Sequence, residues 1–175
     1  MIVSMGKRIL WLMLVLLCAC ALAAFALADE APAQADAPAA EAARVFTEEE
    51  FQTPAQNEPG KAWLALSIEP FEQKMDGKAY QMYNCHMDET NGIGFSIETI
   101  AACTFGDGEP RSQVLTAEQL QEFGMNLVLE PNGSFVLMGG FPKEAYDRMG
   151  IEVTGTDANG EALTFTHWHV FGNAE

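Results

Sequence analysis

The chain has 175 residues, a formal net charge of −16 and 49% apolar residues. Apolar content near one half excludes a wholly disordered chain, and a chain of this length most simply holds one domain. The motifs G-x-x-x-x-G-K-[ST], G-x-G-x-x-G, H-E-x-x-H and G-x-S-x-G are absent, which excludes the commonest motif-bearing enzymes. We therefore expect no catalytic residue and no cofactor.

Residues 1–28 have the layout of a secretory signal, because Lys7 and Arg8 precede an uncharged apolar run from Ile9 to Ala28. Ala26 to Ala28 fit a small-x-small cleavage site. Two other fates stay open: the run is long enough to remain as a membrane anchor, and Cys20 ends an L-C-A-C stretch that resembles a bacterial lipobox. In each case the rest of the chain is expected outside the cytoplasm, secreted or tethered to the outer face of the cytoplasmic membrane.

The strong acidity of the chain restricts its partners. All the acidic residues follow residue 28, so the remainder carries a net charge of −18. Such a field repels phosphate backbones and anionic lipid surfaces. We expect no nucleic acid partner, and membrane contact only through the N-terminal segment; the acidity itself serves solubility.

Residues 29–60 are dominated by Ala, Pro, Asp and Glu, which predicts a disordered acidic linker. As an alternative, Val45, Phe46 and Phe51 around three glutamates form one amphipathic turn that docks on the domain. Residues 61–175 then form the folded domain, which is long enough to bury a core without metal.

Turn dipeptides punctuate this domain and predict an antiparallel meander. They are Asp76-Gly77, Asn91-Gly92, Asp107-Gly108, Asn132-Gly133 and Asn159-Gly160. Between them apolar residues recur with a period of two, as expected of half-buried strands: 64–68, 93–105, 125–129, 135–137, 151–153 and 163–165. The run 93–105 exceeds a usual strand and should bend, with 79–87 as its hairpin partner.

Two short helices interrupt the strands. Thr116 and Gln119 form a capping-box pattern and Gly124 supplies a stop, which predicts a helix over 117–123. Pro142 and Gly150 bound a second predicted helix over 142–149. The fold class is therefore mainly β, a small barrel or flattened sandwich with one or two short helices.

The segment from Ile97 to Leu137 resembles the lipocalin-like domain of secreted or lipid-anchored proteins from Gram-positive gut bacteria. The resemblance follows a long strand, a D-G turn, an L-T-x-E-x-L helix, G-M-x-L-x-L and an N-G hairpin in that order. The matching residues are Asp107, Gly108, Leu115, Thr116, Glu118, Leu120, Gly124, Met125, Leu127, Leu129, Asn132 and Gly133. It implies a lipocalin-like β fold and no catalytic motif; the segments 61–87 and 142–149 depart from the pattern and leave strand order open.

His167 and His169, with Trp168 between them, are the main candidates for chemistry. On a strand both imidazoles lie on one face, a spacing that some metal sites use. With His86 or a carboxylate they would make three ligands, but two ligands alone make no site. We expect them to be ordinary polar histidines and assign them only a weak ligand-binding role.

Cys85 and Cys103 are the only cysteines after the leader. Placed in neighbouring strands of an exported domain, they are expected to form a disulfide; the alternative is two small buried apolar side chains.

These features predict a non-enzymatic exported binding module at the cell envelope, which holds a small apolar ligand or a protein partner. Two alternatives stay open. One is a metal-dependent enzyme centred on His167 and His169, and the other is a structural interaction domain of the envelope.

Overall fold

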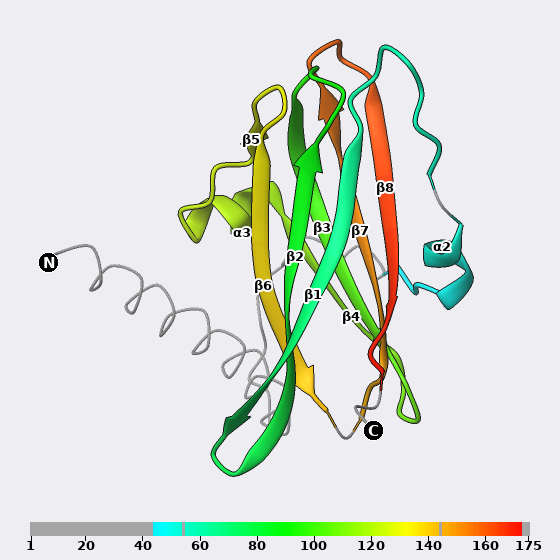
Figure 1. Ribbon diagram of the computed structural model, residues 1–175, viewed down its shortest axis with the longest axis vertical. Helices are drawn as coiled ribbons and strands as arrows, with labels where there is room; N and C mark the ends of the chain where they lie inside the picture. The colour runs from blue at the N-terminus through cyan, green and yellow to red at the C-terminus, as the bar shows by residue number, and fades with distance from the viewer. Residues whose placement is uncertain (1–43, 54, 144, 173–175) are drawn as a thin grey trace, which may run out of the picture. The chain divides into compact units, whose positions relative to one another are not determined.

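The computed structural model describes residues 44–53, 55–143 and 145–172, which belong to one compact unit (Figure 1). The predicted leader, Cys20 and the first part of the predicted linker lie outside these residues. Among the helices described, none has the length and apolar character needed to cross a bilayer.

Two antiparallel sheets make up the fold (Figure 1). Sheet A has the order β1-β2-β6, with β1 at Leu64–Met75, β2 at Lys78–Glu89 and β6 at Ser134–Pro142. Sheet B has the order β4-β3-β7-β8, with β3 at Phe95–Phe105, β4 at Arg111–Thr116, β7 at Arg148–Asp157 and β8 at Ala162–Val170. The two-residue β5, Val128–Leu129, pairs with the start of β3.

The main core lies between the sheets. It combines Leu64, Cys85 and Met87 of sheet A with large apolar side chains of sheet B such as Ile151 and Val153. Each sheet therefore buries one face against the other, which is the arrangement of a flattened sandwich. The prediction of a mainly antiparallel β fold, a small barrel or flattened sandwich with one or two short helices, is confirmed, and the sandwich is the form it takes.

Strand β3 contributes to two cores because it contains a β-bulge. Its pairing with β7 shifts between Ile97 and Thr99. Before the shift Phe95 and Ile97 face the inner core, and after it Ile100 does. Apolar residues stand at odd positions on both sides of the shift, but the extra residue reverses the face to which odd positions point, so that the even-numbered Ile100 replaces them in the inner core. Ala101, Cys103 and Phe105 consequently lie in a second cluster on the outer face of sheet B.

A segment that precedes the sheets covers this second cluster; we call residues 44–53 the strap. The strap contains α2, Glu48–Gln52, and Thr47 donates to the carboxylate of Glu50 through its backbone N–H and its hydroxyl. Phe46 and Phe51 are 6% and 2% exposed. The compact unit therefore begins at Arg44 rather than Lys61. The alternative of a docked amphipathic turn is correct for Phe46 and Phe51, whereas Val45 is exposed.

The two predicted helices have opposite outcomes. The first is confirmed as α3, Ala117–Glu122: Gln119 donates its backbone N–H to the hydroxyl of Thr116, whose own N–H donates to the Gln119 side chain. The prediction over 142–149 is wrong, because β6 runs to Pro142 and β7 begins at Arg148. Proline is compatible with the end of an edge strand, and Met149 alternates with its neighbours to reach the inner core.

The turn signals predicted turns correctly, but not all of them join neighbouring strands. Asp76-Gly77 has positive φ angles and links β1 to β2 as a two-residue hairpin. The prediction that 79–87 pairs with 93–105 is wrong, since β2 pairs with β1 and β6 while the Asn91-Gly92 turn carries the chain into the other sheet. Within the described residues, the chain changes sheet at β2 to β3, β5 to β6 and β6 to β7.

Glu89 holds this end of the sandwich together. It is 2% exposed and accepts hydrogen bonds from the backbone N–H groups of Asn91, Gly92 and Asn132, each at 2.9 Å. Burial by itself would raise the pKa of this carboxyl, but the hydrogen bonds outweigh it and lower the pKa. The ionised carboxylate therefore fixes two turns from different parts of the chain.

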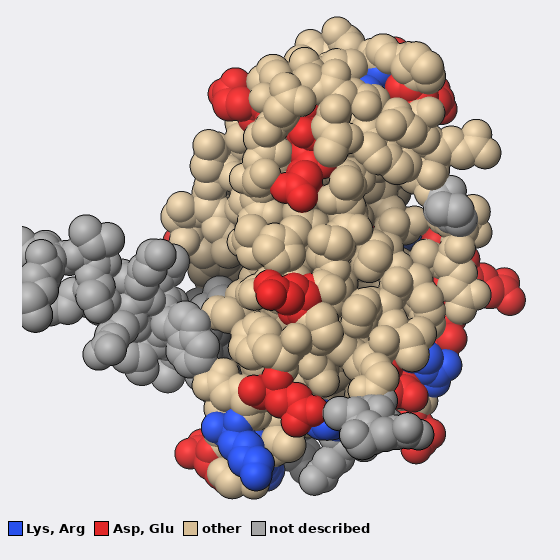
Figure 2. Space-filling view, in the orientation of Figure 1, with Lys and Arg blue, Asp and Glu red and all other residues tan. Residues whose placement is uncertain are grey.

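The outer faces of the two sheets differ. The strap covers part of the outer face of sheet B. The outer face of sheet A is visible in Figure 2 and carries few charged side chains over most of its area. There Glu69 accepts a hydrogen bond from Asn84 and lies 3.4 Å from His86, and Val136 is exposed.

Candidate binding site

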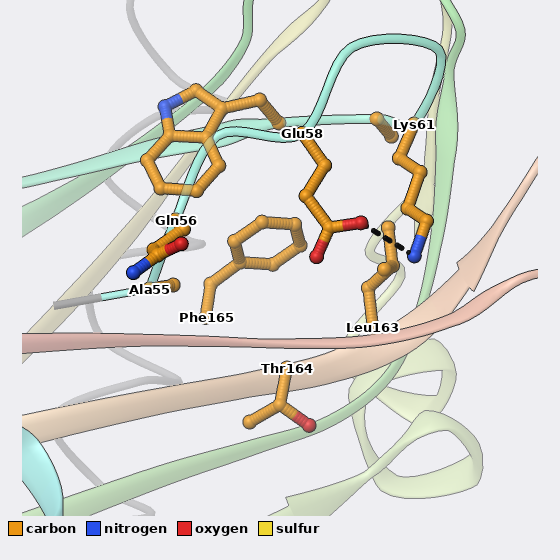
Figure 3. A pocket seen from close by; sticks show the side chains of 9 residues that line it. Ala55, Gln56, Glu58, Lys61, Leu163, Thr164 and Phe165 are labelled. Atoms are coloured by element: carbon orange, nitrogen blue, oxygen red, sulfur yellow. Dashed lines mark ion pairs between the residues drawn. The ribbon is translucent and has the colours of Figure 1, made fainter. Parts of the chain in front are cut away.

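A pocket of about 150 Å³ lies where the segment before β1 crosses β8 (Figure 3). Leu163 and Phe165 point up from β8 into it, while Thr164 alternates to the other side of the strand. The lining residues are Ala55, Gln56, Glu58, Lys61, Ala62, Trp63, Leu163, Thr164 and Phe165. The floor is thus apolar and comes from a strand, and the wall comes from an irregular segment.

Two aromatic side chains, Phe165 of the floor and Trp63 of the wall, shape the pocket. Trp63 and Phe165 meet edge to face with ring centroids 5.6 Å apart, and Phe165 packs in the same way on Phe95 of the inner core. Phe165 is buried and belongs to the core, whereas Trp63 is only half-buried. The aromatic surface offered to a ligand is therefore held by the core and has little freedom to reorganise.

The rim of the pocket is charged. Glu58 and Lys61 form an ion pair at 2.8 Å, and this hydrogen bond raises the pKa of Lys61. The wall is tied down by hydrogen bonds from Asn159 to the carbonyl of Gly60 and from Asn91 to the carbonyl of Lys61. The pocket therefore has apolar side chains in its floor and one cation and one anion at its edge.

His167 and His169 lie side by side on β8, with ring centroids 6.3 Å apart, as their spacing predicted. His169 packs on Phe171 at 4.6 Å. Burial lowers the pKa of both imidazoles, and for His167 the neighbouring His169 lowers it further. Both rings are thereby favoured in the neutral form, as partly buried histidines at the end of an edge strand.

The structure does not bring the third histidine to this pair. His86 is on the outer face of sheet A beside Glu69, away from the inner core that the odd positions of β2 face. Among the residues described, no group of three or more His, Cys, Asp or Glu side chains is placed to hold a metal ion. Trp168 faces the opposite way from the two histidines and packs on Phe105 at 5.4 Å.

The predicted disulfide is wrong, because both cysteines are free. The prediction placed them in adjacent strands, but β2 and β3 belong to different sheets. Cys85 faces the inner core, and the β-bulge turns Cys103 outward under the strap. Burial raises the pKa of each thiol to about 12, so both are the small buried apolar side chains of the alternative interpretation.

Sequence reasoning missed the pocket and offered the strap only as the alternative to a solvated linker. Trp63 and Phe165 appear in the sequence as ordinary apolar residues, and only the crossing of two distant segments makes them neighbours. The strap did have a local signal: Thr47-x-x-Glu50 is a capping-box pattern, followed directly by Phe51.

Comparison with known proteins supports the fold alone. No protein-family model and no curated protein matches the chain. A crystal structure of a Bordetella pertussis protein provisionally called ApaA is similar over 65% of this chain and 95% of that one, at 13% identity and a TM-score of 0.51. An X-ray structure of a structural genomics target is 11% identical over 66% of this chain and 89% of its own, with a TM-score of 0.45. Neither bears on the resemblance to lipocalin-like domains, which stays a prediction.

Proposed function

We propose that the domain is a non-enzymatic binding module whose pocket accepts one apolar side chain of a protein partner. The observation that carries this proposal is the pocket itself, with a rigid aromatic floor and a charged rim at the edge of sheet B. Fold likeness adds nothing to it, because one fold serves many functions.

The size of the pocket favours a side chain over a whole ligand. Sites for complete small molecules enclose roughly 300–1,000 Å³. A volume of about 150 Å³ suits a benzene-sized group, as engineered apolar cavities of similar volume show. Anchor residues of protein interfaces are buried in this manner, with a polar rim around them.

The place of action is part of the same proposal. The apolar N-terminal run after two basic residues supports export, so the partner would be a protein of the cell envelope. The net charge of −18 beyond residue 28 favours a partner with a neutral or basic surface.

The test uses three amino-acid amides as probes of the pocket. Residues 29–175, labelled with ¹⁵N, are titrated with N-acetyl-leucinamide, N-acetyl-phenylalaninamide and N-acetyl-serinamide. We expect the two apolar amides to saturate with a Kd of about 1–10 mM, the range expected for so few atoms, and to shift amide signals of 55–63 and 163–165. The serine analogue should produce no saturable shift.

A matched pair of variants decides whether the pocket is responsible. Ala55→Phe fills the pocket from its wall and should abolish the titration, whereas Val114→Phe adds the same ring to an exposed position of β4 and should leave it unchanged. Equal titration of both variants, or shifts spread over the whole domain, would refute the proposal.

A further inference from the structure

The outer face of sheet B has the features of a peptide-recognition site. Three neighbouring cross-strand rows of its outward side chains run over β3, β7 and β8: Ala101, Glu152 and Thr166; Cys103, Gly150 and Trp168; and Phe105, Arg148 and Val170. Gly150 in the second row has no side chain, and the rings of Phe105 and Trp168 nearby are 5.4 Å apart. The strap packs on this part of the face, with Phe46 and Phe51 in one cluster with Ala101, Cys103 and Phe105.

The fit of the strap depends on shape. Phe51 lies directly over Gly150, where a Cβ would overlap its ring. Phe51 also meets Phe105 with centroids 6.1 Å apart and stacks on Phe46 at 5.6 Å. Two aromatic anchors five positions apart therefore enter one site made by strands 50 to 120 residues further along the chain.

Charge complementarity gives the site an orientation. Arg44 of the strap donates to Glu152 at 2.6 Å, and Glu48 accepts from Arg148 at 2.8 Å. The sheet thus presents an anion where the strap brings a cation, and a cation where it brings an anion. A segment of this pattern fits in one direction only.

The strap owes its order to this site rather than to its own structure. Its helix has five residues, which is too short to be stable alone. Residues 55–63 join it to β1 without helix or strand. The contacts are made by strap side chains and by the carbonyl of Thr53, which accepts a hydrogen bond from the hydroxyl of Thr166. None of them requires that strap and sheet belong to the same molecule.

We infer that the outer face of sheet B binds the strap of a second copy of this chain as it binds its own, giving a strap-exchanged dimer. Each copy supplies one strap and one site, and the strap–site contacts are the same in the closed and exchanged forms. Exchange requires release of residues 55–63, which hydrogen bonds from Asn91 and Asn159 hold in the closed form, so the concentration of chains must offset that cost. Retention of the N-terminal segment in a membrane, one of the fates expected for it, would raise that concentration. The inference does not depend on the pocket.

The test exchanges one charge pair between two copies. Two differently tagged full chains are made, one with Arg44→Glu and one with Glu152→Arg, and are purified in mild detergent because of the apolar N-terminal segment. In either copy alone the strap and its own site carry like charges. In a mixed dimer both strap–site pairs regain opposite charges. Glu48→Arg and Arg148→Glu form a second pair at the other end of the strap, in case either of the first variants fails to fold.

We expect the mixed copies to co-purify about tenfold more than either copy with itself, with the mass of a dimer by light scattering. Both substitutions in one chain should restore the closed form and remove this excess. If the mixture stays monomeric while the double variant recovers wild-type stability, the site accepts only its own strap and the inference is refuted. Association that is independent of these charges would refute it as well, because it would come from the N-terminal segment.

Discussion

Replacement of Phe51 by alanine should open the strap without unfolding the sandwich. The Phe51 ring is 2% exposed, packs on Phe105 and lies directly over Gly150. Cys103 lies beneath the strap and Cys85 lies in the inner core. The two thiols therefore report on two different opening events in one molecule.

The expected magnitude follows from burial. A buried Phe→Ala change costs about 3–5 kcal/mol. Because the strap can leave the sheet, the stability lost on Phe51→Ala cannot exceed the free energy with which the strap docks. We therefore expect a loss at the low end of this range, about 3 kcal/mol. Since 1.4 kcal/mol is a factor of ten, the open form should become roughly 100-fold more populated.

The assay is thiol labelling of residues 29–175 at pH 8, a chain that contains only Cys85 and Cys103. Burial raises both pKa values to about 12, so each thiol reacts only from an open form. With fast reclosing, the labelling rate follows the population of that form. Cys103 should react about 100-fold faster in the variant, while the rate at Cys85 changes much less.

Phe141→Ala is the matched control, because Phe141 packs in the inner core against Tyr83 and Phe171. It should accelerate both thiols together by lowering global stability. If Phe51→Ala also accelerates both thiols equally, or leaves Cys103 protected, the strap is not an independent layer and the reasoning fails.

Three further predictions concern other parts of the domain. Gly150→Ala should speed labelling of Cys103, as Phe51→Ala does, because the new Cβ would overlap the Phe51 ring. Unchanged labelling of Cys103 would contradict the close fit of Phe51 over Gly150. Glu89→Gln should lower the free energy of unfolding, measured with denaturant at pH 7, by about 3 kcal/mol, because the charged acceptor of several backbone N–H groups is lost. The difference from wild type should shrink below pH 4.5, where the wild-type carboxylate becomes protonated. Burial lowers the pKa of His167 and His169 in the folded protein, so as the pH falls the unfolded chain is protonated before the folded one. The free energy of unfolding should therefore decrease as the pH drops below 6.5. The double change to Gln should remove that slope and leave metal content unchanged, whereas stoichiometric metal lost with the histidines would favour the enzyme alternative.

Local signals in the sequence determined much of the secondary structure. Period-two apolar residues with Asn-Gly and Asp-Gly turns predicted a mainly antiparallel β domain, and the Thr116 capping box predicted α3 nearly to the residue. These signals succeed because each depends on interactions within a few residues. Where the signal was weaker, as with Pro142 and Gly150, a short helix was predicted in place of a strand end and a turn.

The pairing of strands, the bulge and the strap were decided only by the tertiary structure. The odd-numbered apolar run of β3 appears continuous in the sequence, yet one extra residue between Ile97 and Thr99 sends its two halves to opposite faces. That reversal separates Cys103 from Cys85 and creates the apolar surface that Phe46 and Phe51 cover. The free energy of burying those rings comes from contacts with strands 50 to 120 residues away, so the pattern within residues 44–53 could offer docking only as one alternative. The pocket between Trp63 and Phe165 likewise depends on contacts between distant segments.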